Sequence, residues 1–118
     1  MKFNRLIPEI AVSDLGKSVN FYTKILGFKK EYSRENFVFL SFQGSQLMIE
    51  FKNDNWKTGD LEYPFGRGIN FQFEVDDVLE ILKKVKKAKH PIFRQLIKKY
   101  YLVKGKKIYV KEFLIQDL

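Results

Sequence analysis

The sequence predicts an α+β fold made of two β-α-β-β-β modules that form a curved mixed sheet around a cavity. The prediction rests on an imperfect internal repeat, because the segment Ile10–Asp14 recurs in altered form as Phe73–Asp77. Each copy is an alternating apolar strand that leads into an aspartate and then into a helical pattern. A turn follows each helix at the same offset, at residues 26–28 and 89–91. Duplicated modules of this kind favour a ligand cleft between or beneath the copies.

The first module is expected over about residues 1–52. It begins with an alternating strand at Leu6–Val12, after which Ser13 or Asp14 caps a helix that Gly27 ends. Residues 43–45 are expected to form a tight turn within a hairpin. The remaining strands are predicted at Phe28–Ser33, Asn36–Phe42 and Gln46–Lys52.

The second module is expected over about residues 69–118, after a polar linker at residues 53–68. It opens with a strand at Ile69–Val75, and either Asp76 or Asp77 caps the next helix. Further strands are predicted at Ile92–Leu96, Tyr100–Val103 and Ile108–Gln116. The last strand of the repeat is missing from this module, and we expect residues 1–118 to form a single domain.

Composition excludes several classes of site. The chain has no cysteine, which excludes disulfides, thiol catalysis and thiolate metal sites. The single histidine, His90, cannot supply a multi-histidine metal centre and is expected to be a turn residue. No segment approaches the ~20 apolar residues that cross a bilayer, so we expect a cytoplasmic protein without a membrane partner.

Positive charge is concentrated in one part of the chain. The formal net charge is +8, and the segment Lys83–Lys111 carries twelve Lys or Arg residues and no acid. This segment is either a lysine-rich face in contact with solvent or a surface for nucleic acid. We favour the solvent-exposed face, because no recognised nucleic-acid motif accompanies the charge.

Several motifs point to a known family. Val12–Leu15, Phe21-Tyr22 and Ile25–Phe28 resemble the first-module signature of the glyoxalase/bleomycin-resistance/extradiol-dioxygenase superfamily, also called vicinal-oxygen-chelate proteins. Glu74–Val78 resembles the opening of the second module. Residues 46–50 and 63–70 are most similar to bleomycin-resistance-type members. The resemblance implies a homodimer in which strands and cavities are shared between chains.

The metal positions of the family are altered in this chain. Superfamily enzymes hold a divalent metal with His or Glu side chains from the first and last strand of each module. The two first-strand positions are occupied here by Ile7 and Asn70, and the fourth position lies on the missing strand. Glu50 alone matches a ligand. The resemblance therefore implies no metal, no cofactor and no catalytic residue, and it counts against an enzyme.

Strand alternation indicates which side chains face the cavity. On Ile69–Val75 the aromatic residues share one face, and Asn70, Gln72 and Glu74 share the other, which we assign to the cavity. The same phase assigns Glu9, Met48 and Glu50 to the cavity. Gathered carboxylates favour a cationic ligand, although each glutamate could instead face water at a sheet edge.

The linker carries a second group of candidates. Trp56 offers a flat surface on which a planar heteroaromatic group could stack, and Tyr63 could extend that surface. Arg67 could meet an anionic group. The alternatives are that Trp56 anchors the loop or a dimer contact and that Arg67 pairs with a surface carboxylate.

We therefore expect a metal-free binding protein that resembles bleomycin resistance proteins and sequesters a cationic or heteroaromatic small molecule, such as a bleomycin-like antibiotic. One alternative is a metal-dependent glyoxalase- or dioxygenase-type enzyme, and a second is a basic nucleic-acid-binding protein. The predicted ligand-binding residues are Glu9, Met48, Glu50, Trp56, Tyr63, Arg67, Asn70 and Gln72.

Overall fold

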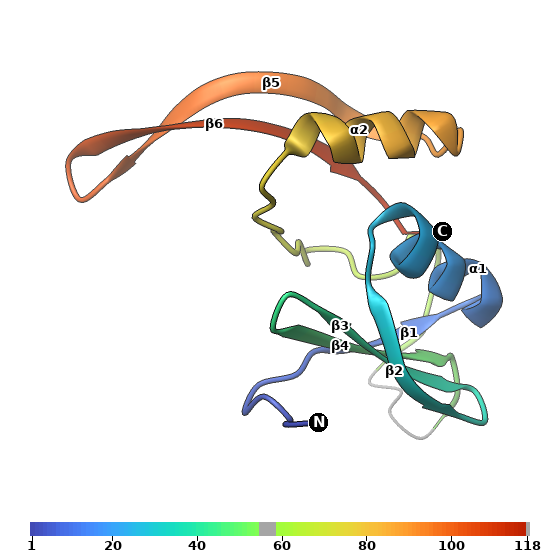
Figure 1. Ribbon diagram of the computed structural model, residues 1–118. Coiled ribbons are helices and arrows are strands. Elements are labelled where there is room, and N and C mark those ends of the chain that lie inside the picture. Colours follow the sequence, from blue (N-terminus) through green and yellow to red (C-terminus); the bar gives the residue numbers. More distant parts are fainter. Residues whose placement is uncertain (55–58, 118) are drawn as a thin grey trace. The chain divides into compact units, whose positions relative to one another are not determined.

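The computed structural model describes residues 1–54 and 59–117 (Figure 1). The chain divides into two compact units, Met1–Phe73 and Glu74–Asp117, and each is described by itself. The first unit holds a mixed four-stranded sheet with one helical segment, and the second holds a two-stranded sheet with one helix. The α+β class predicted from the sequence is confirmed.

The sheet of the first unit has the strand order β1-β4-β3-β2. β1 runs parallel to β4, and the other two pairings are antiparallel. β1 begins later than predicted, directly after Pro8, which lacks the N–H group that a ladder requires. The strands are β1 (Glu9–Val12), β2 (Lys29–Arg34), β3 (Phe37–Phe42) and β4 (Ser45–Phe51).

The helical segment of the first unit begins at a side-chain cap. Asp14 is the N-cap residue, and its Oδ1 accepts a hydrogen bond from the Lys17 amide at 3.0 Å. Helix α1 (Leu15–Asn20) continues into a π-helical turn, η1 (Phe21–Ile25). Gly27, with φ +86°, then reverses the chain toward β2.

The core of the first unit lies between this helical segment and one face of the sheet. Alternation places Val38 and Ile49 opposite each other on that face, and both are buried. The Phe28 ring lies 5.5 Å from Tyr22 and 5.1 Å from Phe42, measured between ring centroids. The opposite face of the sheet is therefore the one that can hold a ligand.

A two-residue turn sets the register of the β3–β4 hairpin. Gln43 and Gly44 have φ values of +47° and +87°, the left-handed pair that a type I′ turn requires. Phe42 is consequently paired with Ser45, and Phe37 at the other end of the hairpin is paired with Glu50. The predicted tight connection at residues 43–45 is confirmed.

The second unit contains helix α2 (Val78–Lys87) and a hairpin of β5 (Ile92–Val103) and β6 (Lys106–Ile115). α2 contacts β6. Asp77 caps α2 by accepting hydrogen bonds from the backbone amides at positions 79 and 80, at 3.1 and 3.3 Å. In the turn after α2, His90 Nε2 lies 2.6 Å from the carbonyl oxygen of Gln116. Neither helix in the described part of the chain is long and apolar enough to cross a membrane.

The predicted strand at Ile69–Val75 is wrong, because the structure shows no strand there. Its counterpart in the first module, β1, exists by pairing with β4. Within residues 1–54 and 59–117, β5 and β6 pair only with each other, so Ile69–Val75 has no partner strand. Isolated extended chain without ladder hydrogen bonds does not form a strand.

The prediction of two separate strands at Ile92–Leu96 and Tyr100–Val103 is also wrong. The intervening residues pair with β6 as well, with Lys98 opposite Lys111 and Lys99 opposite Val110. The result is a single long strand, β5, whose register shifts between Arg94 and Ile97.

Candidate functional site

The sheet register gathers one set of side chains on the face turned away from the helical segment. One row across the strands joins Arg34 to Phe37, Phe37 to Glu50, and Glu50 to Ala11. Directly opposite residues in neighbouring strands project from the same face. The next row on this face is Tyr32, Phe39, Met48 and Glu9. We call these two rows the aromatic–carboxylate face.

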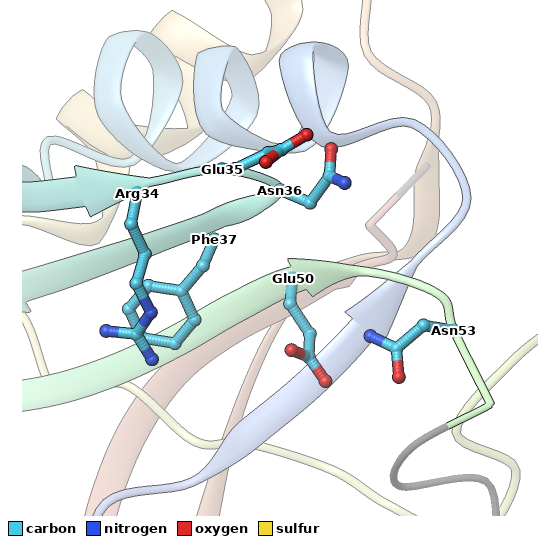
Figure 2. Close-up of a pocket in the computed structure, with 6 residues that line it drawn as sticks. All are labelled: Arg34, Glu35, Asn36, Phe37, Glu50 and Asn53. Carbon is cyan, nitrogen blue, oxygen red and sulfur yellow. The ribbon is translucent and has the colours of Figure 1, made fainter.

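A cavity of about 410 Å³ opens at one end of the aromatic–carboxylate face. Figure 2 shows that Arg34, Phe37, Glu50 and Asn53 extend to the same side, with the guanidinium beside the Phe37 ring. The Arg34 Cζ atom lies 3.8 Å from the centroid of that ring, a cation–π contact. The lining residues are Arg34, Glu35, Asn36, Phe37, Glu50 and Asn53.

Two carboxyl groups meet beside this cavity. Glu9 on β1 and Glu50 on β4 lie on the same face, two residues apart in the parallel register, because Glu9 is paired with Met48. Partial burial raises the pKa of Glu9 above its ordinary value of 4.5, and the Glu50 charge and a hydrogen bond with Glu50 raise it further. The positive charge of Arg34 offsets part of this rise in the Glu9 pKa. A cation placed beside Glu9 would therefore favour its ionised form, which burial and the Glu50 charge disfavour.

The floor of the face is aromatic. Tyr32 and Phe39 stack with their ring centroids 5.1 Å apart and an interplanar angle of 15°. Phe3 meets Phe39 edge-on at 5.4 Å, and Phe39 is fully buried. The N-terminal segment is held here because Gln46 donates to the Lys2 carbonyl at 2.7 Å. This segment therefore contacts the Gln46 end of β4, whereas the cavity lies at the Glu50 end.

The structure brings together three of the predicted ligand-binding residues. Glu9, Met48 and Glu50 share the aromatic–carboxylate face, as the alternation argument proposes. Trp56 lies outside the described residues, so its predicted stacking role stays a prediction.

Tyr63 and Arg67 occupy a separate loop. The Arg67 Nε and Nη2 atoms donate to the carbonyl oxygens of Pro64 and Tyr63, at 3.3 and 3.2 Å. This loop encloses its own small cavity of about 170 Å³, whose lining shares no residue with the cavity at Glu50. The Tyr63 side chain is exposed. In this structure the Arg67 side chain therefore hydrogen-bonds to the backbone of its own loop.

Asn70 and Gln72 do not line the cavity at Glu50. Both are exposed on the unpaired segment Ile69–Val75. Phe73 on the same segment does pack on the helical side, with its ring 5.6 Å from Phe28. Without a neighbouring strand, alternation alone does not direct Asn70 and Gln72 toward the aromatic–carboxylate face.

The ligand-binding residues predicted from the sequence do not include Arg34, Phe37 or Asn53. The signal that finds Phe37 is the two-residue turn at Gln43-Gly44, which fixes Phe37 opposite Glu50. Arg34 follows from the next hairpin, where it pairs with Phe37. Asn53 lies just beyond β4, and no sequence pattern marks it.

The donor atoms do not fit the metal of the superfamily enzymes. Among residues 1–54 and 59–117, no group of three or more His, Asp or Glu side chains gathers in one place. Glu9 and Glu50 supply carboxylates, but the expected first-strand position, Ile7, carries no donor atom. Two carboxylates do not make the four-ligand set that these enzymes require.

A family model described as glyoxalase domain-containing protein 4-like, C-terminal domain, matches residues 14–117. The chain belongs to this family. The superfamily predicted from the motifs is therefore confirmed. The finer assignment to the bleomycin-resistance type stays a prediction. No curated protein matches this glyoxalase-superfamily chain.

Solved structures share the fold. A glyoxalase/bleomycin resistance protein/dioxygenase from Alicyclobacillus acidocaldarius is 22% identical, with a TM-score of 0.66 over 97% of this chain and 83% of that chain. An integron cassette protein from V. cholerae is also 22% identical, with a TM-score of 0.66 over 99% and 91% of the two chains. A lactoylglutathione lyase from Agrobacterium tumefaciens is 15% identical, with a TM-score of 0.59 over 93% and 94%.

Proposed function

We propose that this glyoxalase-superfamily protein is a metal-free binding protein that holds a cationic or heteroaromatic small molecule on its aromatic–carboxylate face. The observation that carries the proposal is that the sheet register places Glu9 and Glu50 on one face, beside the cavity that Glu50 lines. Their mutual repulsion is relieved when a ligand cation sits between or beside them. Arg34 offsets only part of the rise in the Glu9 pKa that burial and the Glu50 charge produce.

The cavity suits a small molecule in size and shape. Its volume of about 410 Å³ lies within the range of about 300–1,000 Å³ that ligand pockets occupy. Phe37 is buried under the Arg34 guanidinium, so a planar ligand ring would stack on the Arg34–Phe37 pair. The side-chain amide of Asn36 adds a hydrogen-bond donor and an acceptor to the lining.

The specific ligand that we propose is a bleomycin-like antibiotic. Such a molecule combines positive charge with planar heteroaromatic rings, and the aromatic–carboxylate face provides a complement to each. The A. acidocaldarius structure, which shares the fold, carries bleomycin resistance in its name. Sequestration requires no chemical step, so the side chains have only to bind and release the ligand.

Isothermal titration calorimetry with bleomycin tests the proposal. The double variant Glu9→Gln/Glu50→Gln should bind about tenfold or more weakly than the native protein, because it loses charge-assisted contacts. Glu80→Gln is the control for charge removal alone, since Glu80 lies in the first turn of α2, in the other unit. Equal affinities of the double variant and the control would overturn the proposal.

The same preparation tests the enzyme alternative. Stoichiometric Zn²⁺, Mn²⁺ or Fe²⁺ in the purified protein, together with turnover of a glutathione hemithioacetal, would replace binding by metal-dependent catalysis. Loss of that metal in the Glu9→Gln/Glu50→Gln variant would then assign these carboxylates as ligands.

We also propose that the chain forms a homodimer with shared strands. The outer edge of β1 carries no partner strand within the described residues, and an uncovered edge favours pairing with another chain. Sedimentation equilibrium should give twice the chain mass of 14.1 kDa. A monomer at every concentration tested would contradict the dimer and leave ligand binding untouched.

A further inference from the structure

The register of the β5–β6 hairpin separates its side chains into two chemically different faces. Lys98 is paired with Lys111, Tyr100 with Tyr109, and Leu102 with Lys107. Paired residues in an antiparallel ladder project from the same side, so every second position joins one surface. We call this surface the Lys–Tyr face, formed by Lys98, Tyr100, Leu102, Lys107, Tyr109 and Lys111.

Aromatic rings and ammonium groups alternate on the Lys–Tyr face. The Tyr100 and Tyr109 rings lie 5.8 Å apart between centroids with an interplanar angle of 56°. The Lys107 Nζ atom lies 4.8 Å from the Tyr100 ring centroid. Tyr100 is 49% exposed and Tyr109 is 75% exposed, so both rings are accessible. No acidic residue belongs to this face.

On the opposite face of the hairpin, part of the positive charge is paired with a carboxylate. Its carboxylate, Glu112, accepts a hydrogen bond from the Tyr101 hydroxyl at 2.7 Å and an ion pair from Lys99 at 3.1 Å. These hydrogen bonds lower the Glu112 pKa, with that from Tyr101 contributing most. Ile97, Ile108 and Val110 are apolar residues on this side, and Lys106 lies at its turn end. The Lys–Tyr face therefore carries more positive charge, with three lysines and no carboxylate among its six residues.

We propose that the Lys–Tyr face binds single-stranded nucleic acid. Its lysines would neutralise backbone phosphates, while Tyr100 and Tyr109 present ring faces on which unpaired bases stack. A positively charged track combined with aromatic stacking surfaces is the way proteins bind single strands without reading their sequence. A second copy of the chain is a poorer occupant, because two such faces repel each other.

The structure changes the interpretation of the basic segment Lys83–Lys111. In the sequence, its lysines are most simply a solvent-exposed surface without an aromatic motif. Pairing of β5 with β6 brings tyrosines from both strands together among the lysines, which linear order does not show. The proposal uses only the second unit, so it stands or falls separately from ligand binding at Glu9 and Glu50.

Fluorescence anisotropy of the full chain with a labelled oligothymidylate of about twenty nucleotides is the direct test. If three phosphates are contacted, raising NaCl from about 50 to about 200 mM should lower the affinity about 20-fold. The variant Tyr100→Ala/Tyr109→Ala should lose about tenfold or more in affinity. The variant Tyr100→Phe/Tyr109→Phe keeps both rings and should bind like the native protein.

The contribution of the lysine charges to oligonucleotide binding is tested with two matched triple variants. Lys98→Gln/Lys107→Gln/Lys111→Gln should bind weakly and lose most of the salt dependence. Lys83→Gln/Lys84→Gln/Lys87→Gln removes the same charge from the exposed side of α2 and should change the affinity by less than about threefold. Equal losses in the two triple variants would show diffuse attraction and overturn the proposal.

Other outcomes also contradict the proposal. Failure of the native protein to bind the oligonucleotide at the lower salt concentration would end it. Binding to phosphatidylserine vesicles instead, removed by the lysine variant of the Lys–Tyr face, would assign that face to an anionic membrane. Self-association abolished by Tyr100→Phe/Tyr109→Phe would assign it to a second copy of the chain. Circular dichroism shows whether each variant remains folded.

Discussion

The carboxyl groups of Glu9 and Glu50 lie on one face of the sheet and interact electrostatically, although they come from strands at opposite ends of the first module. The parallel pairing of β1 with β4 creates this contact. Burial and the neighbouring negative charge both raise the Glu9 pKa, so the contact costs stability whenever both groups are ionised.

The Glu9 variant should show a pH-dependent gain in stability. Above the ordinary pKa of 4.5 and up to the raised pKa, the native state binds more protons at Glu9 than the unfolded state. The free energy of unfolding therefore falls as the pH rises through this window, and the cost is complete above it. Glu9→Gln removes the cost, so its Tm should exceed that of the native protein by about 1–3 °C at about pH 8.

The same difference in Tm should vanish at about pH 3, where Glu9 is almost fully protonated in both states. Thermal unfolding followed by circular dichroism measures both values, with Glu80→Gln as the control for net charge. A Tm difference that does not change with pH would contradict the contact between the two carboxyl groups.

Affinity for a cationic ligand should rise with pH. A cation beside Glu9 favours its ionised form and lowers its pKa, so binding releases protons near the raised pKa. The affinity should increase as the pH rises from about 4.5 and level off once Glu9 is ionised in the free protein. Calorimetry in buffers of different ionisation enthalpy measures the released protons, and a flat pH profile would argue against a ligand at Glu9.

The cap of α2 is a test with a neighbouring control. Asp77 accepts hydrogen bonds from the amides of Leu79 and Glu80, so Asp77→Ala should lower the free energy of unfolding by about 1 kcal/mol. Asp76→Ala removes the same charge one residue earlier and should cost less than about 0.5 kcal/mol. Denaturant unfolding measures the stability of the two variants. Equal losses of unfolding free energy would mean that Asp77 is not the cap.

Phe39 should be the most costly aromatic residue to truncate. It is fully buried and contacts the rings of Phe3 and Tyr32, so Phe39→Ala should destabilise the protein by about 3–5 kcal/mol. Phe93 on β5 is 48% exposed, and Phe93→Ala should cost about 1 kcal/mol or less. Chemical denaturation compares the two, and a similar loss for both would show that Phe39 is not in the core.

The hairpin turn before β4 depends on backbone conformation alone. A Cβ added at Gly44 meets no atom within 4 Å, but Gly44 has φ +87°. Gly44→Ala should therefore cost about 1 kcal/mol from the left-handed conformation, without a steric clash. At Gly59 an added Cβ also meets nothing within 4 Å, and this glycine does not have a left-handed φ. Gly59→Ala should cost less than about 0.5 kcal/mol in the same denaturation experiment.

Local features were predictable because their energy comes from neighbouring residues. An aspartate before an apolar helical pattern indicates a cap, and Asp14 and Asp77 both act as caps. Gln43-Gly44 and Lys104-Gly105 mark turns, and both pairs have positive φ values. The choice between Asp76 and Asp77 stayed open in the sequence, because either could precede the same apolar pattern.

Non-local features required the tertiary structure. Ile69–Val75 has the alternation of a strand, but a strand forms only where a second strand supplies hydrogen bonds, and none does so in the described part of the chain. The predicted place of Asn70 and Gln72 beside Glu50 depended on that missing partner.

The sequence by itself determined the superfamily, the α+β class, the helix caps and the hairpin turns. Only the tertiary structure decided that Arg34 joins Glu9 and Glu50 on one surface and that Tyr100 meets Tyr109 among lysines. The physical reason is that capping and turn energies act over a few residues, whereas strand register joins distant segments. A change of one residue in register would send each of these side chains to the other face.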